Sequence, residues 1–395
     1  MQYAKIYLNR GREESIKRFH PWIFSGAVNH LDGNTEEGDV VEVYDSQGNY
    51  LATGHCQIGS IAVRILSFNK EKIDRNFWEK RIKTALSLRK SLGLIRNDNN
   101  TFRLIHGEGD NLPGLIIDLY GETAVLQAHS PGMHVARTEI AESLQNVLNG
   151  SLKNIYYKSE DTLPFNAGLE PENNYLLGGQ NVPETALENG LNFHIDWIRG
   201  QKTGFFIDQR ENRLLVEKYS ANRNVLNMFC YTGGFSCYAM RGQAAAVHSV
   251  DSSAKAIDLA NRNISLNFPN DNRHKTFADD AFNFLNRMEK DQYDMIILDP
   301  PAFAKHRKVL KNALQGYKKL NVAAIEKIRQ GGLLFTFSCS QAVSKEDFQL
   351  AVFSASAQTG RTVRIIKHLT QQEDHPVNIY HPEGEYIKGL ILHVE

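Results

Sequence analysis

From about residue 190 onward, apolar strand-like segments alternate with helical segments, and this alternation restricts the fold more than any other feature of the sequence. It is typical of a parallel, doubly wound sheet with helices on both faces. Such sheets bind ligands at the carboxyl ends of their strands, so candidate site residues should follow each strand. The expected strands are Val225–Met228, Ala246–Val250, His274–Phe277, Tyr293–Leu298 and Leu333–Phe337, and the expected helices lie near 234–241, 253–266, 281–290 and 308–329.

The first 188 residues have a different pattern, which divides the chain into three expected domains. Residues 1–70 contain short alternating segments separated by turn residues, as in a small β domain. Residues 71–188 begin with a charged helix and continue with strands and a second helix, as in an α+β domain. Residues 189–395 form the expected α/β domain. Expected elements before residue 189 are Val40–Tyr44, Tyr50–Gly54, Ile61–Leu66, Leu115–Tyr120, Thr123–Ala128 and Val135–Leu148.

Charge and cysteine content exclude several classes of protein. Lys and Arg together number 45, as do Asp and Glu, so the chain is not globally basic, although a local basic patch is compatible with this balance. The cysteines are too few for a disulfide framework and form no CxxC pair. We find no run of about 18 apolar residues and no apolar signal core in Met1–Arg10. We therefore expect a cytoplasmic protein with no membrane segment and no metal site.

The first three strands of the expected sheet are followed by residues suited to a nucleoside-containing ligand. The Gly233-Gly234 turn lets a ligand approach the backbone, although a packing turn is the alternative and the GxGxxG fingerprint is absent. Asp251 is placed either to accept hydrogen bonds from ribose hydroxyls or to cap a helix. After the third strand, one of Asp279 and Asp280 could face an adenine amino group while the other caps the next helix. We favour Asp280 for the adenine.

The fourth and fifth strands end in the most specific motifs of the chain. In Asp299-Pro300-Pro301-Ala302-Phe303, two prolines fix the backbone and hold an acidic side chain at the edge of the sheet. A flat base could hydrogen-bond there and stack on Phe303, whereas the alternative is a turn that only ends the strand. Cys339 follows the fifth strand and would lie beside Asp299. It is either a small apolar filler or a nucleophile, and a nucleophile needs a base or a lowered pKa that a sequence does not reveal.

Two further segments carry candidate binding residues. Before the sheet, the aromatic pair Phe205-Phe206 could pack under a ligand, and Gln209 or Arg210 could reach its polar groups. The alternative is an amphipathic edge strand and helix start. From Pro300 to Ile325 no acidic residue occurs. The cations of this stretch could neutralise RNA phosphates or simply form a solvated helix face. The first arginine and lysines among them are Lys305, Arg307 and Lys308.

These motifs, in this order, resemble those of the RlmI (YccW) type of ribosomal RNA large-subunit methyltransferase. The matching residues are Lys202-Thr203-Gly204, Asp208-Gln209-Arg210, Asn227, Tyr231-Thr232-Gly233-Gly234-Phe235, Asp251, Asp299-Pro300-Pro301-x-Phe303 and Phe337-Ser338-Cys339-Ser340. The segments Gly11-Arg12-Glu13 and His20-Pro21-Trp22-Ile23-Phe24-Ser25-Gly26 look like the PUA-like RNA-binding module of that family. With Asp374-His375-Pro376 near the end, the resemblance covers essentially the whole chain.

The resemblance implies a fold, a cofactor and a substrate. The fold would be a small β PUA domain and an α+β middle domain, followed by a Rossmann-like class I methyltransferase domain. The cofactor would be S-adenosylmethionine, and the product would be 5-methylcytosine in 23S ribosomal RNA of the large subunit. Self-association as a homodimer is left open.

The resemblance also implies roles for individual residues. Cys339 would be the nucleophile that adds to cytosine carbon 6, and Asp299 would bind the target base. Gly233 would contact the methionine part of the cofactor, Asp251 the ribose and Asp280 the adenine. The implied cofactor-binding set is Phe206, Gln209, Arg210, Asn227, Phe229, Tyr231, Thr232, Gly233, Gly234, Asp251, Ser252, Asp279, Asp280 and Asp299. The candidate substrate-binding set is Pro300, Pro301, Phe303, Lys305, Arg307 and Lys308.

Two other functions are compatible with the same motifs. Many RNA cytosine-5 methyltransferases carry a second cysteine after the fourth strand, but none follows Pro300-Pro301 here, so the group that removes the carbon-5 proton is left open.

Methylation of an exocyclic base nitrogen is the first alternative function, because the Asp-Pro-Pro motif suits an amino group and that route needs no cysteine. The second alternative is a catalytically inactive RNA-binding assembly factor.

Overall fold

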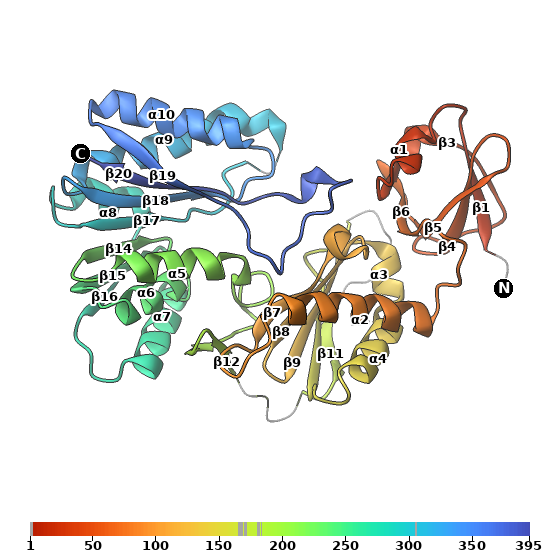
Figure 1. Cartoon of the computed structure of the whole chain (residues 1–395), viewed down its shortest axis with the longest axis horizontal. Helices are drawn as coiled ribbons and strands as arrows, with labels where there is room; N and C mark the ends of the chain where they lie inside the picture. Colours follow the sequence, from red (N-terminus) through yellow and green to blue (C-terminus); the bar gives the residue numbers. More distant parts are fainter. Residues whose placement is uncertain (1–2, 165–168, 170–171, 180–181, 183, 305) are drawn as a thin grey trace. The chain divides into compact units, whose positions relative to one another are not determined.

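The computed structural model describes residues 3–164, 169, 172–179, 182, 184–304 and 306–395 (Figure 1). The chain forms two compact units, and neither is one continuous stretch of sequence. The first unit comprises Met1–Gly190, Ile195–Ile207 and Glu373–Gly384, and the second comprises Leu191–His194, Asp208–Gln372 and Glu385–Glu395. The short strands β12 (Thr185–Glu188) and β13 (Leu191–His194) lie where the chain passes from the first unit to the second.

The first unit begins with a six-stranded sheet in the order β2-β6-β5-β4-β1-β3. Every neighbouring pair is antiparallel except β1 and β4, which are parallel. Val41 and Val43 are fully buried and alternate with the partly exposed residues Val40, Glu42 and Tyr44, so one face of β4 packs on the core of this sheet. The elements are β1 (Ala4–Leu8), α1 (Glu14–Lys17), β2 (Trp22–Phe24), β3 (Val28–Asp32), β4 (Val40–Tyr44), β5 (Tyr50–Cys56) and β6 (Ile61–Ser67).

A five-stranded sheet in the order β11-β10-β9-β8-β7 forms the rest of the first unit together with its helices. Asp74 caps the long helix α2 by accepting a hydrogen bond from the Phe77 amide. Trp78 and Ile82 lie one turn apart on α2, and both are buried in the core that the helix shares with the sheet. The elements are α2 (Arg75–Ser91), β7 (Thr101–His106), β8 (Leu115–Tyr120), β9 (Thr123–Ala128), α3 (Pro131–Val135), α4 (Arg137–Val147), β10 (Asn154–Lys158) and β11 (Asn173–Leu177).

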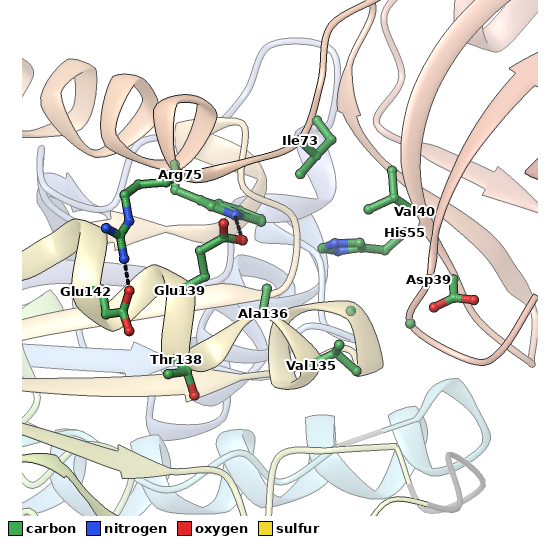
Figure 2. A pocket seen from close by; sticks show the side chains of 13 residues that line it. Asp39, Val40, His55, Ile73, Arg75, Val135, Ala136, Thr138, Glu139 and Glu142 are labelled. Atoms are coloured by element: carbon green, nitrogen blue, oxygen red, sulfur yellow. Dashed lines mark hydrogen bonds and ion pairs between the residues drawn. The ribbon is translucent and has the colours of Figure 1, made fainter. Parts of the chain in front are cut away.

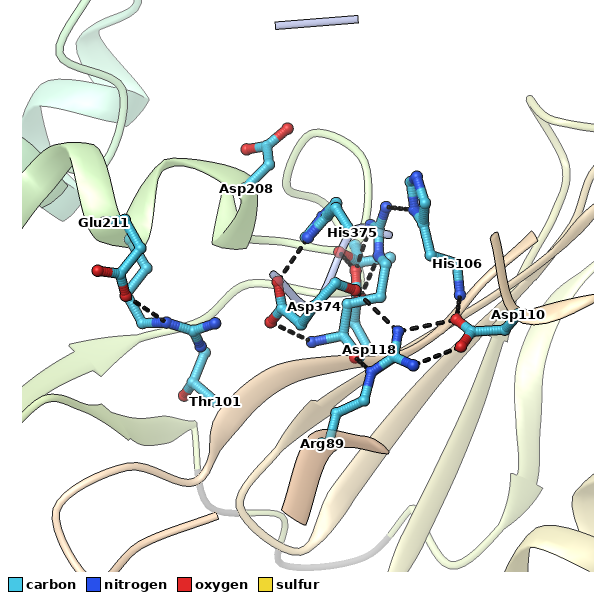
Figure 3. Close-up of polar contacts among 12 residues, drawn as sticks. Arg89, Thr101, His106, Asp110, Asp118, Asp208, Glu211, Asp374 and His375 are labelled. Carbon is cyan, nitrogen blue, oxygen red and sulfur yellow. Dashed lines mark hydrogen bonds and ion pairs between the residues drawn. The ribbon is translucent and has the colours of Figure 1, made fainter. Parts of the chain in front are cut away.

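Buried charges join three distant parts of the first unit (Figure 3). Arg89 on α2 pairs with Asp110, and Arg103 on β7 pairs with Asp118 on β8 at 2.7 Å. Asp374 comes from the 373–384 segment, and its carboxylate accepts a hydrogen bond from the Arg103 amide at 3.0 Å. The Arg89 guanidinium donates to the backbone carbonyl of Asp374 at 2.9 Å. A segment near the C-terminus is thereby part of the first unit.

The second unit is built on a seven-stranded sheet in the order β16-β15-β14-β17-β18-β20-β19. Strands β16, β15, β14, β17 and β18 are parallel, and β20 is antiparallel to both of its neighbours. The first five strands have the order 3-2-1-4-5 of a doubly wound sheet, so the topological switch point lies between β14 and β17. The strands are β14 (Asn224–Met228), β15 (Ala246–Asp251), β16 (His274–Ala278), β17 (Met295–Leu298), β18 (Gly332–Ser338), β19 (Val363–Leu369) and β20 (Lys388–Val394).

Helices cover both faces of this sheet, as the alternating pattern predicts. Helices α5, α6 and α7 pack on one face, and α8, α9 and α10 pack on the other (Figure 1). All five expected strands and all four expected helices are present, although β17 begins at Met295 rather than at Tyr293. The helices are α5 (Arg210–Tyr219), α6 (Gly234–Arg241), α7 (Ala254–Asn267), α8 (Ala281–Arg287), α9 (Leu310–Lys327) and α10 (Lys345–Thr359). None of the helices described here is long and apolar enough to span a bilayer.

Candidate active site

The loop after β14 has an unusual backbone for its sequence. Phe229, Tyr231 and Gly233 all have positive φ, at 58°, 46° and 78°. For Gly233 this conformation costs little, whereas a side chain there would also meet the Ala260 Cβ at 3.0 Å. The amide of Gly233 donates to the Cys230 carbonyl at 2.8 Å, and α6 begins at the next residue. The Gly-Gly turn therefore brings a tightly turned backbone and a helix N-terminus to the carboxyl end of β14.

Asp251 fixes this loop from the end of the neighbouring strand. One carboxylate oxygen accepts a hydrogen bond from the Tyr231 amide at 2.9 Å, and the other accepts from the Ser253 amide at 2.9 Å. The N-cap of α7 is Ser253 rather than Asp251. Each carboxylate oxygen has two lone pairs, so Asp251 still has acceptor capacity for hydroxyl groups of a ligand.

The two acidic residues after β16 have different partners. Asp280 is the N-cap of α8 and accepts from the Asn283 amide at 3.0 Å. Asp279 pairs with Arg287 at 2.6 Å. The capping role thus belongs to Asp280, the residue that we favoured for adenine, whereas contact of either carboxylate with adenine stays a prediction.

The two strands at the switch point, β14 and β17, both have polar residues at or just beyond their carboxyl ends. The Asn227 side chain is fully buried and donates to the Ser236 hydroxyl at 2.9 Å. Its Oδ1 atom has no hydrogen-bond partner among the described residues. Beyond the end of β17, the Asp299 carboxylate accepts a hydrogen bond from the side-chain Nε2 atom of Gln209 at 3.2 Å. Gln209 is buried and is itself held by Asn212, which donates to it at 2.6 Å.

The Cys339 segment lies against the Asp-Pro-Pro turn. The Cys339 Sγ atom is 3.9 Å from the Pro300 carbonyl oxygen, and the side chain is partly exposed. The Ser340 hydroxyl accepts a hydrogen bond from the Ala304 amide at 3.2 Å and is 2.9 Å from the Tyr317 hydroxyl on α9. Ser340 therefore ties the loop after β18 to the loop after β17, and sulfur and carboxylate are carried by two loops that contact each other.

The remaining residues of the predicted substrate set differ in exposure. Phe303 is half-buried, with its ring centre 4.7 Å from that of Tyr317, so one side of the ring is already occupied. Pro301 and Lys308 are exposed, and Pro300 is buried. Arg307 begins the short helix Arg307–Val309, and Lys305 lies outside the described residues.

Arg210 and Phe206 are two further residues of the predicted cofactor-binding set. Arg210 begins α5, and its side chain is almost fully buried, with its Nε atom 4.0 Å from a carboxylate oxygen of Glu211. Phe206 belongs to the first unit, where the Lys202 amine lies 4.7 Å from the centre of its ring.

The first unit has a pocket that none of the predicted site residues lines (Figure 2). Its volume is about 570 Å³. Glu139 accepts a hydrogen bond from the Trp78 indole at 3.0 Å, and Arg75 pairs with Glu142. His55 lies in the same wall, and burial lowers its pKa to about 4, so it is neutral at pH 7. Arg75, Glu139 and Glu142 already have partners within the pocket wall, and we assign this pocket no catalytic role.

Comparison with known proteins identifies the family. The S-adenosylmethionine-dependent methyltransferase family matches residues 172–378, and the PUA-like domain family matches residues 6–68. The ribosomal RNA large subunit methyltransferase I of Alteromonas mediterranea is 40% identical over 395 residues, which cover 99% of each chain. The enzyme of the same name from Aeromonas hydrophila is 38% identical, over 98% of this chain and 99% of its own.

The chain belongs to the ribosomal RNA large subunit methyltransferase I family. The resemblance drawn from the motifs is thereby confirmed, as is the expected combination of a PUA-like domain and an S-adenosylmethionine-dependent methyltransferase domain. Solved structures agree in fold. A Streptococcus mutans protein described as an S-adenosylmethionine-dependent methyltransferase has a TM-score of 0.83 at 23% identity, over 100% of both chains. A methyltransferase solved in complex with S-adenosylhomocysteine has a TM-score of 0.84 at 24% identity, also over 100% of both chains.

The residues at the strand ends fit the cofactor of this family. The Asn227 Oδ1 atom is a buried acceptor without a hydrogen-bond partner in the described part of the chain, and it lies at the switch point. A bound group with an N–H or O–H donor would satisfy it. The Gly233 turn and the Asp251 carboxylate follow the two adjacent strands, where S-adenosylmethionine would place its polar groups. Among the described residues, no cluster of three or more His, Cys, Asp or Glu could hold a metal ion.

Sequence reasoning missed three residues next to Cys339, namely Tyr317, Ser340 as the residue that joins the two loops, and Lys388. Lys388 opens β20, a strand that we did not predict, and it is 5% exposed. The sequence contains a feature that could have indicated this residue, because one lysine lies among the mostly apolar residues of Tyr386-Ile387-Lys388-Gly389-Leu390-Ile391. A charge in an apolar strand is seldom buried without a partner.

Proposed function

We propose that this chain methylates carbon 5 of cytosine in 23S ribosomal RNA of the large subunit, with S-adenosylmethionine as the methyl donor. The curated relatives that match over nearly the full chain carry the name of that ribosomal RNA methyltransferase, which supports the substrate. The observation that supports the reaction at cytosine carbon 5 is the contact between the loop after β17 and the loop after β18. The Cys339 thiol lies 3.9 Å from the carbonyl of Pro300, the residue that follows Asp299 in the chain.

The chemistry follows from these two groups. The cofactor supplies an electrophilic methyl group. Carbon 5 of cytosine is a weak nucleophile until the Cys339 thiolate forms a bond to carbon 6, which turns carbon 5 into an enamine-like carbon. Asp299, placed near ring nitrogen 3, would stabilise the adduct by sharing a proton with it. Transfer of the methyl group to carbon 5 would leave S-adenosylhomocysteine. A base that is still to be identified would then accept the carbon-5 proton, and its electron pair would expel the thiolate from carbon 6.

The other predicted roles belong to the same proposal. Gly233 and the loop after β14 would hold the methionine part of the cofactor, Asp251 its ribose, and Asp279 or Asp280 its adenine. The RNA would contact Pro300, Pro301, Phe303 and the cations Lys305, Arg307 and Lys308. A base that reacts at carbon 5 and carbon 6 must leave any stack, so the target would lie in single-stranded or opened RNA.

We propose three domains, at 1–70, 71–188 and 189–395, and residence in the cytoplasm, where this RNA is found. The PUA-like match over residues 6–68 supports the first boundary. We also propose that the chain is a homodimer. Exposed apolar side chains on α10 and on the edge strand β19, such as Phe353 and Ile366, support a contact between copies. Light scattering that returned the mass of one chain would contradict the dimer.

The decisive experiment removes the thiol. We expect Cys339→Ala to lower methylation of cytosine in large-subunit RNA by at least about 1000-fold, because the route through carbon 6 is lost. Mass-spectrometric mapping of the modified base measures this, and Cys56→Ala in the N-terminal sheet is the matched control with unchanged activity. RNA that contains 5-fluorocytosine should trap a covalent adduct with the wild-type chain and none with Cys339→Ala.

The same experiment separates the alternatives. Methylation that survives Cys339→Ala at an exocyclic nitrogen would favour the amino-group route. No methylation by the wild-type chain, together with no heat on titration with S-adenosylmethionine, would favour an assembly factor without activity.

A further inference from the structure

The lysine that opens β20 is buried beside the loop that carries Cys339. Lys388 lies opposite Ser338 in the antiparallel pairing of β18 with β20. Its side chain is 5% exposed, and its Nζ atom donates a hydrogen bond to the Ser340 carbonyl at 2.7 Å. Cys339 lies between Ser338 and Ser340 in the chain. Lys388 therefore holds the backbone on both sides of Cys339, through strand pairing at Ser338 and through the hydrogen bond to Ser340. This hydrogen bond limits how far the loop can move from the sheet.

Ser340 receives support from three directions. Its carbonyl accepts from Lys388, and its hydroxyl contacts both the Ala304 amide and the Tyr317 hydroxyl. Burial raises the pKa of Tyr317, so this hydroxyl stays neutral at pH 7 and contributes no charge. Lys388 is therefore the cationic member of a buried cluster whose other polar members are neutral.

Lys388 and the Cys339 thiol also interact electrostatically. Burial lowers the pKa of the Lys388 amine to about 8, while a negative charge on Cys339 acts in the opposite direction and favours the ammonium form. Glu385 also favours the ammonium form and Lys345 opposes it, but these two residues pair with each other at 2.5 Å. Asp299 lies in the loop after β17, which contacts the Cys339 loop, and its carboxyl group would disfavour the thiolate when it is ionised. Near neutral pH, most of the Lys388 amines still carry the charge that opposes this effect.

We propose that Lys388 is the positioning residue and counter-charge of Cys339, holding the Ser340 carbonyl and favouring the ionised thiol. It acts through Cys339 and need not touch RNA or cofactor. When Cys339 ionises, the thiol proton leaves to solvent and Lys388 keeps its own proton. The inference deepens the proposed function, because a thiolate is the form that adds to a pyrimidine carbon.

Alkylation of the thiol tests this pairing without RNA or cofactor. The full chain is treated with iodoacetamide over a range of pH, and the rate at Cys339 is followed by mass spectrometry of its peptide. In the wild-type chain we expect the midpoint below about 8.5, the ordinary thiol value. Lys388→Met should raise the midpoint by at least about one unit, which makes alkylation at pH 7 about tenfold slower. Lys388→Arg should restore the low midpoint, because arginine keeps its charge.

Lys345→Met is the matched control, since Lys345 is an exposed lysine that also acts on Lys388, and its midpoint should match the wild type. A wild-type midpoint at or above 8.5, or an unchanged midpoint in Lys388→Met, overturns the proposal. Circular dichroism checks that each variant is folded. If Lys388→Met does not fold, the wild-type midpoint and that of Lys388→Arg still decide, because both must be low.

The outcome is separable from that of the proposed function. A midpoint that depends on Lys388 while methylation survives Cys339→Ala would reject the covalent route and keep the pairing. A normal loss of methylation in Cys339→Ala with no effect of Lys388 on the midpoint would keep the route and reject the pairing.

Discussion

Two single residues in the loop after β14, where we expect the cofactor to bind, have an energetically unfavourable backbone conformation. Phe229 and Tyr231 have positive φ without being glycine, which costs on the order of 1 kcal/mol each. The Tyr231 amide is held by the Asp251 carboxylate at 2.9 Å. Asp251 therefore has two tasks, since it maintains the strained loop and presents acceptor oxygens to a ligand.

We expect Asp251→Ala to weaken binding of S-adenosylmethionine by at least about tenfold. A hydrogen bond to a charged group contributes about 1.5–3 kcal/mol, and the substitution also releases the Tyr231 amide. Isothermal titration calorimetry measures the change in dissociation constant. Asp258→Ala on the exposed side of α7 is the control, with unchanged affinity. Equal affinities of Asp251→Ala and wild type would show that the carboxylate contributes nothing to binding.

Among the elements of the second unit, β16 forms one edge of the seven-stranded sheet and carries a partly buried histidine. The Nε2 atom of His274 is 2.8 Å from the Ser249 hydroxyl on β15. Burial lowers the pKa of His274 to about 4, and the nearby His248 adds to this effect. Between about pH 6.5 and 4, the unfolded chain binds a proton at this position and the folded chain does not. The free energy of unfolding must therefore fall as the pH falls through this window.

We expect His274→Gln to reduce the acid sensitivity of the second unit. At pH 5 the wild-type histidine should lower the free energy of unfolding by roughly 2 kcal/mol relative to pH 7, and glutamine removes that loss. Urea unfolding followed by circular dichroism at the two pH values measures the difference. His368→Gln, on the exposed edge strand β19, should leave the pH dependence as it is in wild type. A variant with the wild-type loss between pH 7 and pH 5 would contradict the assignment.

At the scale of the whole molecule, neither unit is a contiguous stretch of sequence. Residues Glu373–Gly384 belong to the first unit although more than 150 residues of the second unit precede them. The buried charges around Asp374 explain why this segment is retained there. Removing one member of such a network leaves a buried donor without an acceptor.

We therefore expect Asp374→Ala to lower the free energy of unfolding of the first unit by about 2–4 kcal/mol. Trp22, Trp78 and Trp197, the three tryptophans of the chain, all lie in the first unit, so tryptophan fluorescence in urea reports on that unit. Glu373→Ala, an exposed neighbour, is the control and should have the wild-type midpoint. A wild-type midpoint for Asp374→Ala would show that the segment is not held by this carboxylate.

The amino-acid pattern was sufficient to predict the doubly wound sheet and the order of the residues at its strand ends. Apolar periodicity and turn residues are local signals, and they led to all five expected strands and to the Gly233, Asp251, Asp299 and Cys339 positions. The motif order also identified the family. These features depend on residues that are neighbours along the chain.

Which distant residues come together depends on long-range contacts that form when the chain folds. Asp280 caps α8 because the helix begins at Ala281. The sequence pattern predicted where the helix begins but did not distinguish the role of Asp280 from that of Asp279. Strand β20 and its Lys388 reach Cys339 from 49 residues further along the chain, by pairing with β18. Asp374 joins the first unit by the same kind of long-range contact. The partner of a buried charge is selected by packing and desolvation in the folded state, and neither leaves a periodic signal in the sequence.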